Sequence, residues 1–474
     1  MPGEIITIQA GQCGNQIGQK FWQQLCNEHG ILPDGTGMPV PDSVKIREDQ
    51  TNIFFQSNSD DNRYTPRALL IDLEPRVVSS ITSNFTMFNP RNIHLASNGG
   101  GAGNIWAQGY KYATGHSDEF MDMLDKELDK CDSLEGFQLI HSVAGGTGSG
   151  VGSYLLEMLS DRYAKKLNTT FSIFPEMEQT SDVVVQPYNT VLTLKRLIES
   201  SDANIVFDNG ALSSIALNNL QVKSPSFEQT NQLVSTVMSA ITNPLRFPSY
   251  SYNTMTSIIS TLIPTPDLHF LTPTYTPFTS DFVSEARDIR KSTAYDVILE
   301  LLDKKLKMVK SSPDNHGLYI SALDIIQGDI EQSDIQKGLI KAQQRIEFVP
   351  WTSSSVHLAK SKRSPFLKQK INRTPVSGLM LSNQTSIVSL FNKVLSQYDK
   401  LMKRNAFVEA YRKHNYDGFD ILEEFQNSRD MVESLIDEYR NSESMKYLED
   451  DEEDEEFGIL STAVADEEDA EMLG

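Results

Sequence analysis

The stretch that decides the fold is Ala144-Gly145-Gly146-Thr147-Gly148-Ser149-Gly150. It lies between an apolar run at 137–143, FQLIHSV, and an amphipathic pattern at 151–163, VGSYLLEMLSDRY, which predict a strand and a helix. Glycines let the backbone approach an anion closely, and the free N–H groups at the start of the following helix attract phosphate. Neither a Walker A sequence nor a dinucleotide fingerprint is present, so backbone, hydroxyl groups such as those of Thr147 and Ser142, and a cation are expected to meet the phosphate charge. A glycine turn with only packing duties is the alternative.

The first 210 residues repeat one pattern, in which a short apolar run is followed by a loop rich in Gly, Asn or Asp and then by a helical pattern. This alternation predicts parallel strands with helices on both faces of the sheet, and ligands of such sheets bind at the carboxyl ends of the strands. The predicted strands are 5–8, 68–71, 93–96, 137–143, 170–174 and 204–207.

Two more glycine loops follow predicted strands. Residues 11–18, GQCGNQIG, begin a helix with an apolar face that ends at Gly30, and residues 99–104, GGGAGN, follow the strand that ends at 96. Asp72 and Glu74 follow the strand at 68–71 and share one face of it, so both carboxylates can reach a hydrated Mg²⁺. Three glycine loops at strand ends predict a phosphate site. A helix cap before Pro75 is the alternative role of the carboxylates.

Later segments divide the chain further. A helical pattern covers 228–242, a proline-rich stretch and mixed strand and helix signals continue to about residue 382, and amphipathic helices are expected at 387–401 and 422–439. We therefore expect a nucleotide-binding domain at 1–226, a central helix at 227–243, an α+β domain at 244–384, a helical domain at 385–447 and a disordered acidic tail at 448–474.

Charge and cysteine content limit the class of protein. The net charge is −22, of which thirteen acidic residues between Tyr447 and Gly474 supply the larger part and leave −9 for the preceding 446 residues. This acidity argues against nucleic-acid binding. Three cysteines without disulfide or zinc spacing favour a reducing compartment, and no apolar run has the length of a membrane span. We expect a soluble cytosolic or nuclear protein with no membrane insertion.

The strings AGQCGNQIG, GGGAGN and AGGTGSG resemble the signatures of the tubulin/FtsZ family, and the similarity continues through SDVVVQPYN and NQLVSTVMSAIT to the acidic tail. The strings DLEPRVV, LRFPSY and KRNAFVEAYR are most similar to the gamma branch, and the long tail resembles its divergent fungal forms. The resemblance implies a parallel Rossmann-like GTPase sheet with a central helix, an α+β intermediate domain and C-terminal helices.

By residue matching, the resemblance implies a GTP or GDP site with Mg²⁺. Asn209 and Asn231 match the asparagines that read guanine, Phe227 stands where most tubulins stack a tyrosine on the base, and Asp182 matches the ribose loop. Asp72 and Glu74 match the magnesium positions and are expected to reach the ion through water molecules. The remaining implied GTP-binding residues are Gly11, Gln12, Cys13, Gln16, Gly101, Ala102, Gly103, Asn104, Ser142, Ala144, Gly145, Gly146, Thr147 and Gly148.

One departure concerns hydrolysis. Ser257 occupies the position at which alpha-tubulin carries the glutamate that activates hydrolysis on a neighbouring subunit, and a hydroxyl is a poor general base. This chain is therefore not expected to activate hydrolysis on a neighbouring subunit. For its own nucleotide the resemblance implies at most weak GTPase activity, with the catalytic glutamate supplied by a neighbouring alpha-tubulin on the nucleotide face.

The resemblance further implies microtubule nucleation at a microtubule-organising centre such as the spindle pole body. The implied partners are gamma-tubulin complex proteins, alpha/beta-tubulin and lateral copies of the same subunit. A subunit of the microtubule wall and a free-standing GTPase are the alternatives. His141 is expected to be a core histidine. The segment 276–283 matches a loop that makes lateral contacts between tubulin subunits. The basic run that starts at Lys360 fits a solvated face slightly better than a partner contact.

Overall fold

The computed structural model describes residues 3–39, 49–58, 62–97, 99–176, 183–219, 225–248, 251–277, 293–310, 317–328, 330–364, 366–367, 376–415 and 419–448. Asp182, residues 278–283 of the expected lateral loop and the acidic tail from Glu449 onward lie outside these ranges.

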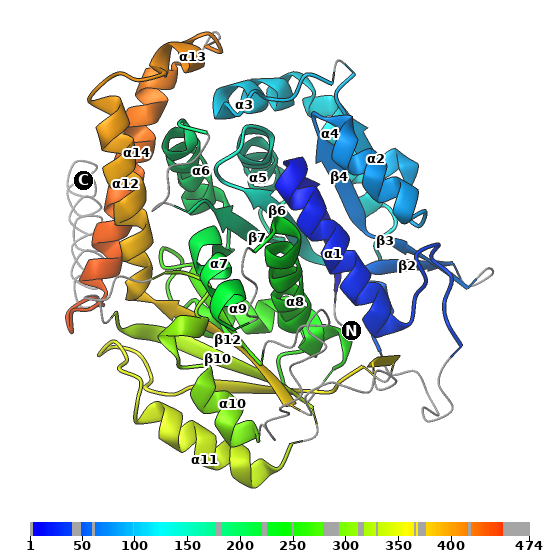
Figure 1. The fold of residues 1–474 in the computed structure, drawn as a ribbon, viewed down its shortest axis with the longest axis vertical. Helices are drawn as coiled ribbons and strands as arrows, with labels where there is room; N and C mark the ends of the chain where they lie inside the picture. The colour runs from blue at the N-terminus through cyan, green and yellow to red at the C-terminus, as the bar shows by residue number, and fades with distance from the viewer. Residues whose placement is uncertain are drawn as a thin grey trace, which may run out of the picture.

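A ten-stranded sheet forms the centre of the molecule, in the order β11-β10-β12-β9-β8-β7-β6-β1-β4-β5 (Figure 1). The strands from β9 to β5 in this order pair in parallel, whereas β12 is antiparallel to both of its neighbours. All six predicted strands are confirmed, and the hairpin of β2 and β3 was not predicted. The strands are β1 Glu4–Ala10, β2 Phe55–Asn58, β3 Arg63–Pro66, β4 Ala68–Asp72, β5 Ile93–Leu95, β6 Leu134–Ser142, β7 Leu167–Phe174, β8 Ala203–Asp208, β9 Phe270–Thr276, β10 Tyr319–Gly328, β11 His357–Ser361 and β12 Val376–Gln384.

Helices cover both faces of the sheet. All seven residues of β1 are buried because Ile5 packs into the hydrophobic cluster on one face and Ile6 and Ile8 into the cluster on the other. One face carries α1 Gly11–His29, α2 Pro75–Asn84, α7 Asn209–Asn218, α8 Phe227–Arg246 and α9 Met255–Leu262. The other carries α3 Trp106–Gly115, α4 Ser117–Leu128, α5 Gly152–Arg162 and α6 Gln186–Ser200, with α12 Val388–Met402, α13 Val408–Arg412 and α14 Ile421–Asn441 outside them (Figure 1).

The expected α+β segment continues the same sheet. Strand β9 joins β8 through the parallel pairs Asn204↔Phe270 and Ile205↔Leu271, and β12 and β10 extend the sheet from there. A third hydrophobic cluster lies between this end of the sheet and the helices α10 Ala294–Glu300 and α11 Gln332–Gln343. This segment therefore has its own core but shares its backbone pairing with the first half of the chain.

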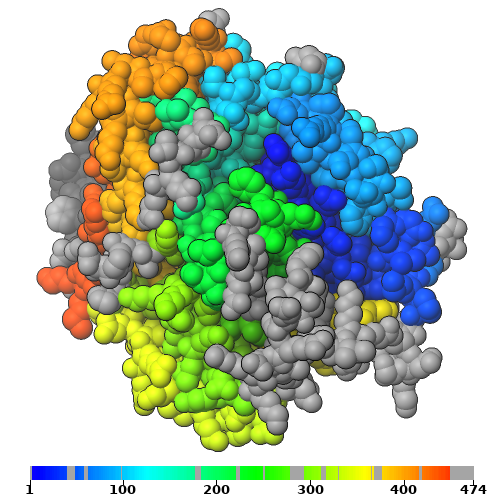
Figure 2. Space-filling view, in the orientation of Figure 1, coloured from blue at the N-terminus to red at the C-terminus, as the bar shows by residue number. Residues whose placement is uncertain are grey.

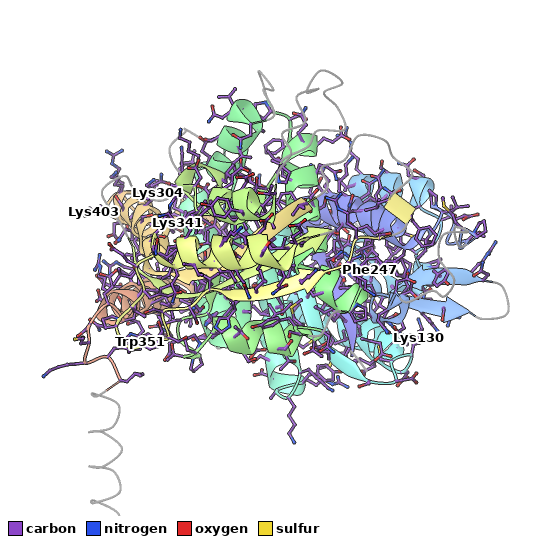
Figure 3. All side chains as sticks on the ribbon, turned by 90° about the horizontal axis from the view of Figure 1, so that it is seen from below. Lys130, Phe247, Lys304, Lys341, Trp351 and Lys403 are labelled. Carbon is purple, nitrogen blue, oxygen red and sulfur yellow. The ribbon has the colours of Figure 1, made fainter. Side chains whose placement is uncertain are left out.

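The long helices agree with the sequence pattern. Helix α8 begins at Phe227 after a capping box formed by Ser226 and Gln229, and it ends at Arg246, two residues after Pro244. Helices α12 and α14 confirm the two C-terminal patterns and pack against α6. They lie at one end of the molecule, where Lys403 follows α12, whereas Lys130 lies toward the opposite end (Figure 3).

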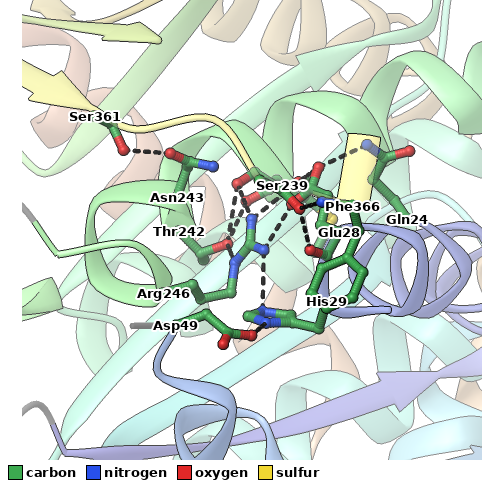
Figure 4. A network of polar contacts seen from close by, with 12 residues as sticks. Gln24, Glu28, His29, Asp49, Ser239, Thr242, Asn243, Arg246, Ser361 and Phe366 are labelled. Atoms are coloured by element: carbon green, nitrogen blue, oxygen red, sulfur yellow. Dashed lines mark hydrogen bonds and ion pairs between the residues drawn. The ribbon is translucent and has the colours of Figure 1, made fainter. Parts of the chain in front are cut away.

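A buried polar network joins the C-terminal ends of α1 and α8 (Figure 4). The Arg246 guanidinium, fully buried, lies 2.6 Å from a carboxylate oxygen of Glu28 and donates to the Ser239 carbonyl at 2.7 Å. Burial opposes ionisation of Glu28, but the charge of Arg246 and the hydrogen bonds from Ser239, Gln24 and Arg246 together outweigh it and hold the pKa of that carboxyl below its usual value. Burial also lowers the pKa of His29, so its neutral ring donates from Nδ1 to Asp49 at 2.6 Å and accepts from Arg246 at Nε2.

We expect Arg246→Leu to lower the free energy of unfolding by about 3–5 kcal/mol, because it leaves Glu28 charged, buried and unpaired. Urea denaturation followed by circular dichroism measures the change. Arg440→Leu is the matched control, since Arg440 pairs with Asp437 on the surface, where both side chains are more than half exposed, and its loss should cost at most about 1 kcal/mol. Equal losses in the two variants would contradict the assignment.

Candidate nucleotide site

The predicted loops meet at one edge of the sheet. Strands β6, β1, β4 and β5 are neighbours and run in parallel, so their carboxyl ends lie together. Residues 144–148 follow β6, Gly11 follows β1, Asp72 ends β4 with Glu74 just after it, and residues 99–104 follow β5. This is the edge at which ligands bind to open parallel sheets.

The loops touch one another through glycine backbone. Gly11 has φ +73°, and a Cβ atom on it would lie 2.7 Å from the backbone nitrogen of Gly148. A Cβ atom on Gly146 would lie 2.8 Å from the nitrogen of Ile105 and 2.9 Å from the carbonyl oxygen of Ala102. Any larger residue at these positions would therefore push the three loops apart.

The opposite side of the loops is open. In the described part of the chain, no heavy atom lies within 4 Å of a Cβ atom placed on Gly145 or on Gly100. Helix α1 starts directly at Gly11, and a π-helical turn at Thr147–Val151 leads into α5. Neither the start of α1 nor the start of this turn has a side-chain cap or an acidic residue in its first turn. Uncapped helix starts attract anions, and the space at Gly145 and Gly100 leaves room for one near the loops.

Two buried polar side chains support these loops from behind. His141 is a core histidine, as predicted: burial lowers its pKa to about 4, and its neutral ring lies 3.1 Å from the Gly148 carbonyl and 2.9 Å from the Ser172 hydroxyl. Asn15, whose role was not predicted, donates from Nδ2 to the carbonyls of Gly11 at 2.9 Å and Ile71 at 3.1 Å, and so joins α1 to the end of β4.

The two carboxylates are placed beside the loops. Asp72 is buried, and its Oδ1 accepts the amides of Leu73 and Glu74, whereas its Oδ2 has no partner among the described residues. Burial, with a smaller contribution from the Glu74 charge, raises the pKa of Asp72 to about 6. Glu74 lies against the glycine loop, because a Cβ atom on Gly101 would lie 2.6 Å from Oε1 of Glu74. Glu74 directly precedes α2, but its side chain does not cap that helix. The alternative role as a helix cap is thus not filled by Glu74, and the orphaned buried carboxylate oxygen of Asp72 fits a divalent cation.

Two residues matched to the base, Phe227 and Asn231, lie in the first turns of α8, beside the start of α1. Asn231 Nδ2 lies 3.5 Å from Gln16 Oε1, and the ion pair of Lys20 and Glu228, 2.7 Å long, joins the same two helices. Phe227 is 76% exposed and so leaves its ring face free for stacking. Helices α1 and α8 lie side by side on the face shown in Figure 2, where dark blue meets green.

The other matched residues are placed as follows. Gln12 is exposed, whereas Cys13, a thiol whose pKa burial raises to about 12, is half-buried on the first turn of α1. Asn209 begins α7 and is not its cap, because Asp208 accepts the Gly210 amide in that role. Asp182 lies outside the described residues.

A further buried side-chain amide, that of Asn189, contacts the backbone of two loops and was not predicted. The sequence QPYN, which contains it, was noted only as part of the family resemblance.

Fold and loops together define a class of protein, a nucleotide-binding α/β protein with three glycine loops. Family models match the chain twice, the "Tubulin/FtsZ family, GTPase domain" at residues 4–216 and the "Tubulin C-terminal domain" at residues 266–396. The chain belongs to the tubulin/FtsZ family, and the nucleotide that its GTPase domain implies is a guanine nucleotide.

Curated relatives narrow this assignment to the gamma branch. The chain is 51% identical to the tubulin gamma chain of Eremothecium gossypii over 453 residues, which is 95% of each protein. It is 48% identical to the tubulin gamma chain of Candida glabrata over 454 residues, 95% of this chain and 96% of the relative. Both relatives are fungal, in agreement with the resemblance of the tail. Among the described residues, no helix is long and apolar enough to cross a membrane.

We expect Gly146→Ala to destabilise the nucleotide-free protein by about 1–3 kcal/mol, because its methyl group would collide with the backbone at 102–105. Gly145→Ala is the matched control: its methyl group meets open space and its φ is not positive, so stability should be unchanged or slightly raised. Thermal unfolding without nucleotide measures both. An equal decrease for the two variants would contradict the packing of the loops.

Proposed function

We propose that this chain binds GTP and Mg²⁺ at the loop edge of the sheet and nucleates microtubules from alpha/beta-tubulin as a subunit of a gamma-tubulin complex. The observation that carries the proposal is the identity of about half of all residues with tubulin gamma chains over 95% of the sequence. The packed glycine loops support the nucleotide part of the proposal, because their open side presents uncapped amides.

In this proposal the phosphates lie on the amides of residues 144–148, of the 101–104 loop and of the first turn of α1, and the Ser142 and Thr147 hydroxyls face them. The guanine base stacks on Phe227, with Asn209 and Asn231 bonding its edge and Asp182 near the ribose. Mg²⁺ is held by Asp72 and Glu74 through water, which gives the orphaned Oδ2 of Asp72 a partner. The cation supplies charge neutralisation for the terminal phosphates.

Hydrolysis is proposed to depend on a second protein. Ser257 lies in the first turn of α9, and its hydroxyl donates to the carbonyl of Thr254 at 2.7 Å. A hydroxyl engaged in this way supplies neither the charge nor the basicity of a glutamate. The chain is therefore suited to receive an alpha-tubulin on its nucleotide face but not to activate GTP on a subunit beneath it.

This asymmetry suits a template at the minus end of a microtubule. Several copies held in a ring or spiral by gamma-tubulin complex proteins would present their nucleotide faces in register and lower the entropic cost of starting a filament. The proposed location is a microtubule-organising centre, such as the spindle pole body, in the cytoplasm or nucleus. Lateral contacts between copies would use the segment 276–283, most of which lies outside the described residues.

We expect Asn231→Ala to weaken GTP binding by about 1–3 kcal/mol, because the guanine edge loses its hydrogen-bond partner. Asn441→Ala, at the exposed end of α14, is the control and should bind GTP as the wild type does. Isothermal titration with GTP measures both. Unchanged affinity in the first variant would remove Asn231 from the base site.

The nucleation proposal is tested with purified alpha/beta-tubulin, followed by turbidity. Substoichiometric amounts of this chain with its complex proteins should shorten the lag before polymerisation, and labelled protein should mark the minus ends. Incorporation along the whole filament would instead indicate a subunit of the wall. GTP turnover by the isolated chain above the order of 1 s⁻¹ would indicate a free-standing enzyme.

A further inference from the structure

Asn189, in the first turn of α6, is fully buried and uses all of its hydrogen-bonding capacity. Its Nδ2 donates to the carbonyl of Asn104 at 2.8 Å and to that of Ala144 at 2.9 Å. Its Oδ1 accepts from the Trp106 amide at 2.9 Å and from the Tyr411 hydroxyl at 2.6 Å. The two carbonyls need donors and the Trp106 amide needs an acceptor, so the orientation of the side-chain amide is fixed by its neighbours.

Three of these four contacts hold the nucleotide loops. Asn104 is in the left-handed region, with φ +57°, and Asn189 fixes the carbonyl of this unfavourable conformation. Ala144 opens the loop at 144–148, and Trp106 begins α3 directly after the loop at 99–104. One buried side chain therefore sets the distance between two of the three loops.

The fourth contact reaches a different layer of the molecule. Tyr411 belongs to α13, is fully buried, and is kept protonated by burial, which holds its pKa well above the usual value. Helix α13 lies beside α3 at the outside of the molecule (Figure 1), and it is preceded by Phe407, which is 53% exposed with φ +60°. The hydroxyl of Tyr411 thus connects a surface helix with the loops through a single amide.

We propose that Asn189 is a positioning residue for the nucleotide loops and that Tyr411 couples Asn189 to α13. The position of α13 and the affinity for the nucleotide then depend on each other. This inference rests on the proposed nucleotide site. Thermodynamic linkage makes such a coupling reciprocal: nucleotide binding orders α13, and whatever displaces α13 loosens the loops.

The chain contains a matched control for Tyr411. Tyr398 is also fully buried, donates one hydrogen bond, to the Phe425 carbonyl at 3.0 Å, and packs edge-on against Tyr188 as Tyr411 does. That hydrogen bond joins α12 to α14, and within the described ranges Tyr398 makes none with the nucleotide loops. Tyr→Phe at either position removes one hydroxyl and leaves the ring in place.

The test measures dissociation of a fluorescent GTP analogue from the full chain. Tyr411→Phe should release it about three- to tenfold faster, the effect of one lost hydrogen bond on the loops, whereas Tyr398→Phe should leave the rate unchanged. Equal acceleration in both variants, or none in either, would overturn the proposal, because the hydroxyl would then act only through general stability or not at all.

Amide hydrogen exchange on the nucleotide-free protein gives a second readout that does not depend on GTP binding. Segments 99–109 and 142–152 should exchange faster in Tyr411→Phe than in Tyr398→Phe, and equal exchange would overturn the inference. Failure of the wild type to bind GTP would instead refute the proposed function, while the exchange comparison would still decide whether Tyr411 positions the loops.

Discussion

The close approach of the backbone at residues 144–150 to its neighbours is the constraint on which the rest of the structure depends. A Cβ atom on Gly148 would lie 3.1 Å from the carbonyls of both Ala10 and Ser142, and one on Gly150 would lie 2.3 Å from the carbonyl of Trp106. Strand β1 must therefore lie next to β6, and α3 must cross directly over the start of α5. These contacts bring the starts of α1 and α5 and the loop before α3 around one small space, an arrangement that suits an anion.

Much of the fold could be predicted because its signals are local. The six strands of the first half are apolar runs, α8, α12 and α14 have clear helical periodicity, and glycine marks the loops. The hairpin of β2 and β3 was missed because FQSN and RYTP are short and polar. The continuity of the sheet was missed for a different reason: β9 joins β8 through only two residue pairs, and a strand containing Pro273 resembles a boundary more than a sheet interior.

The site was predictable to a similar extent. The sequence alone predicted that the glycine loops and the carboxylates of Asp72 and Glu74 lie together, because they follow parallel strands whose carboxyl ends meet at one edge of the sheet. The side chains that hold the loops in place gave no such signal, because Asn15 and Asn189 act on backbone groups that are up to 85 residues away in sequence, and Asn189 meets Tyr411 across 222 residues. A buried amide has no periodicity, so only the folded chain reveals its partners. The assignment of Phe227 and Asn231 to the base depended on the family resemblance for the same reason.

Helix α8 connects this site with the second half of the sheet. Its first turns carry Phe227 and Asn231 beside the start of α1, and its last turn carries Arg246 in the buried network with Glu28. Twenty residues of helix place these ends about 30 Å apart. At the far end, the Asn243 side chain accepts a hydrogen bond from Ser361, and the Glu28 carbonyl accepts one from Ser364. The segment at and after β11 is thus hydrogen-bonded to both α8 and α1. Because these hydrogen bonds are directional, a rotation of α8 at the base end changes the geometry of its contacts with β11 unless the helix bends at Pro244.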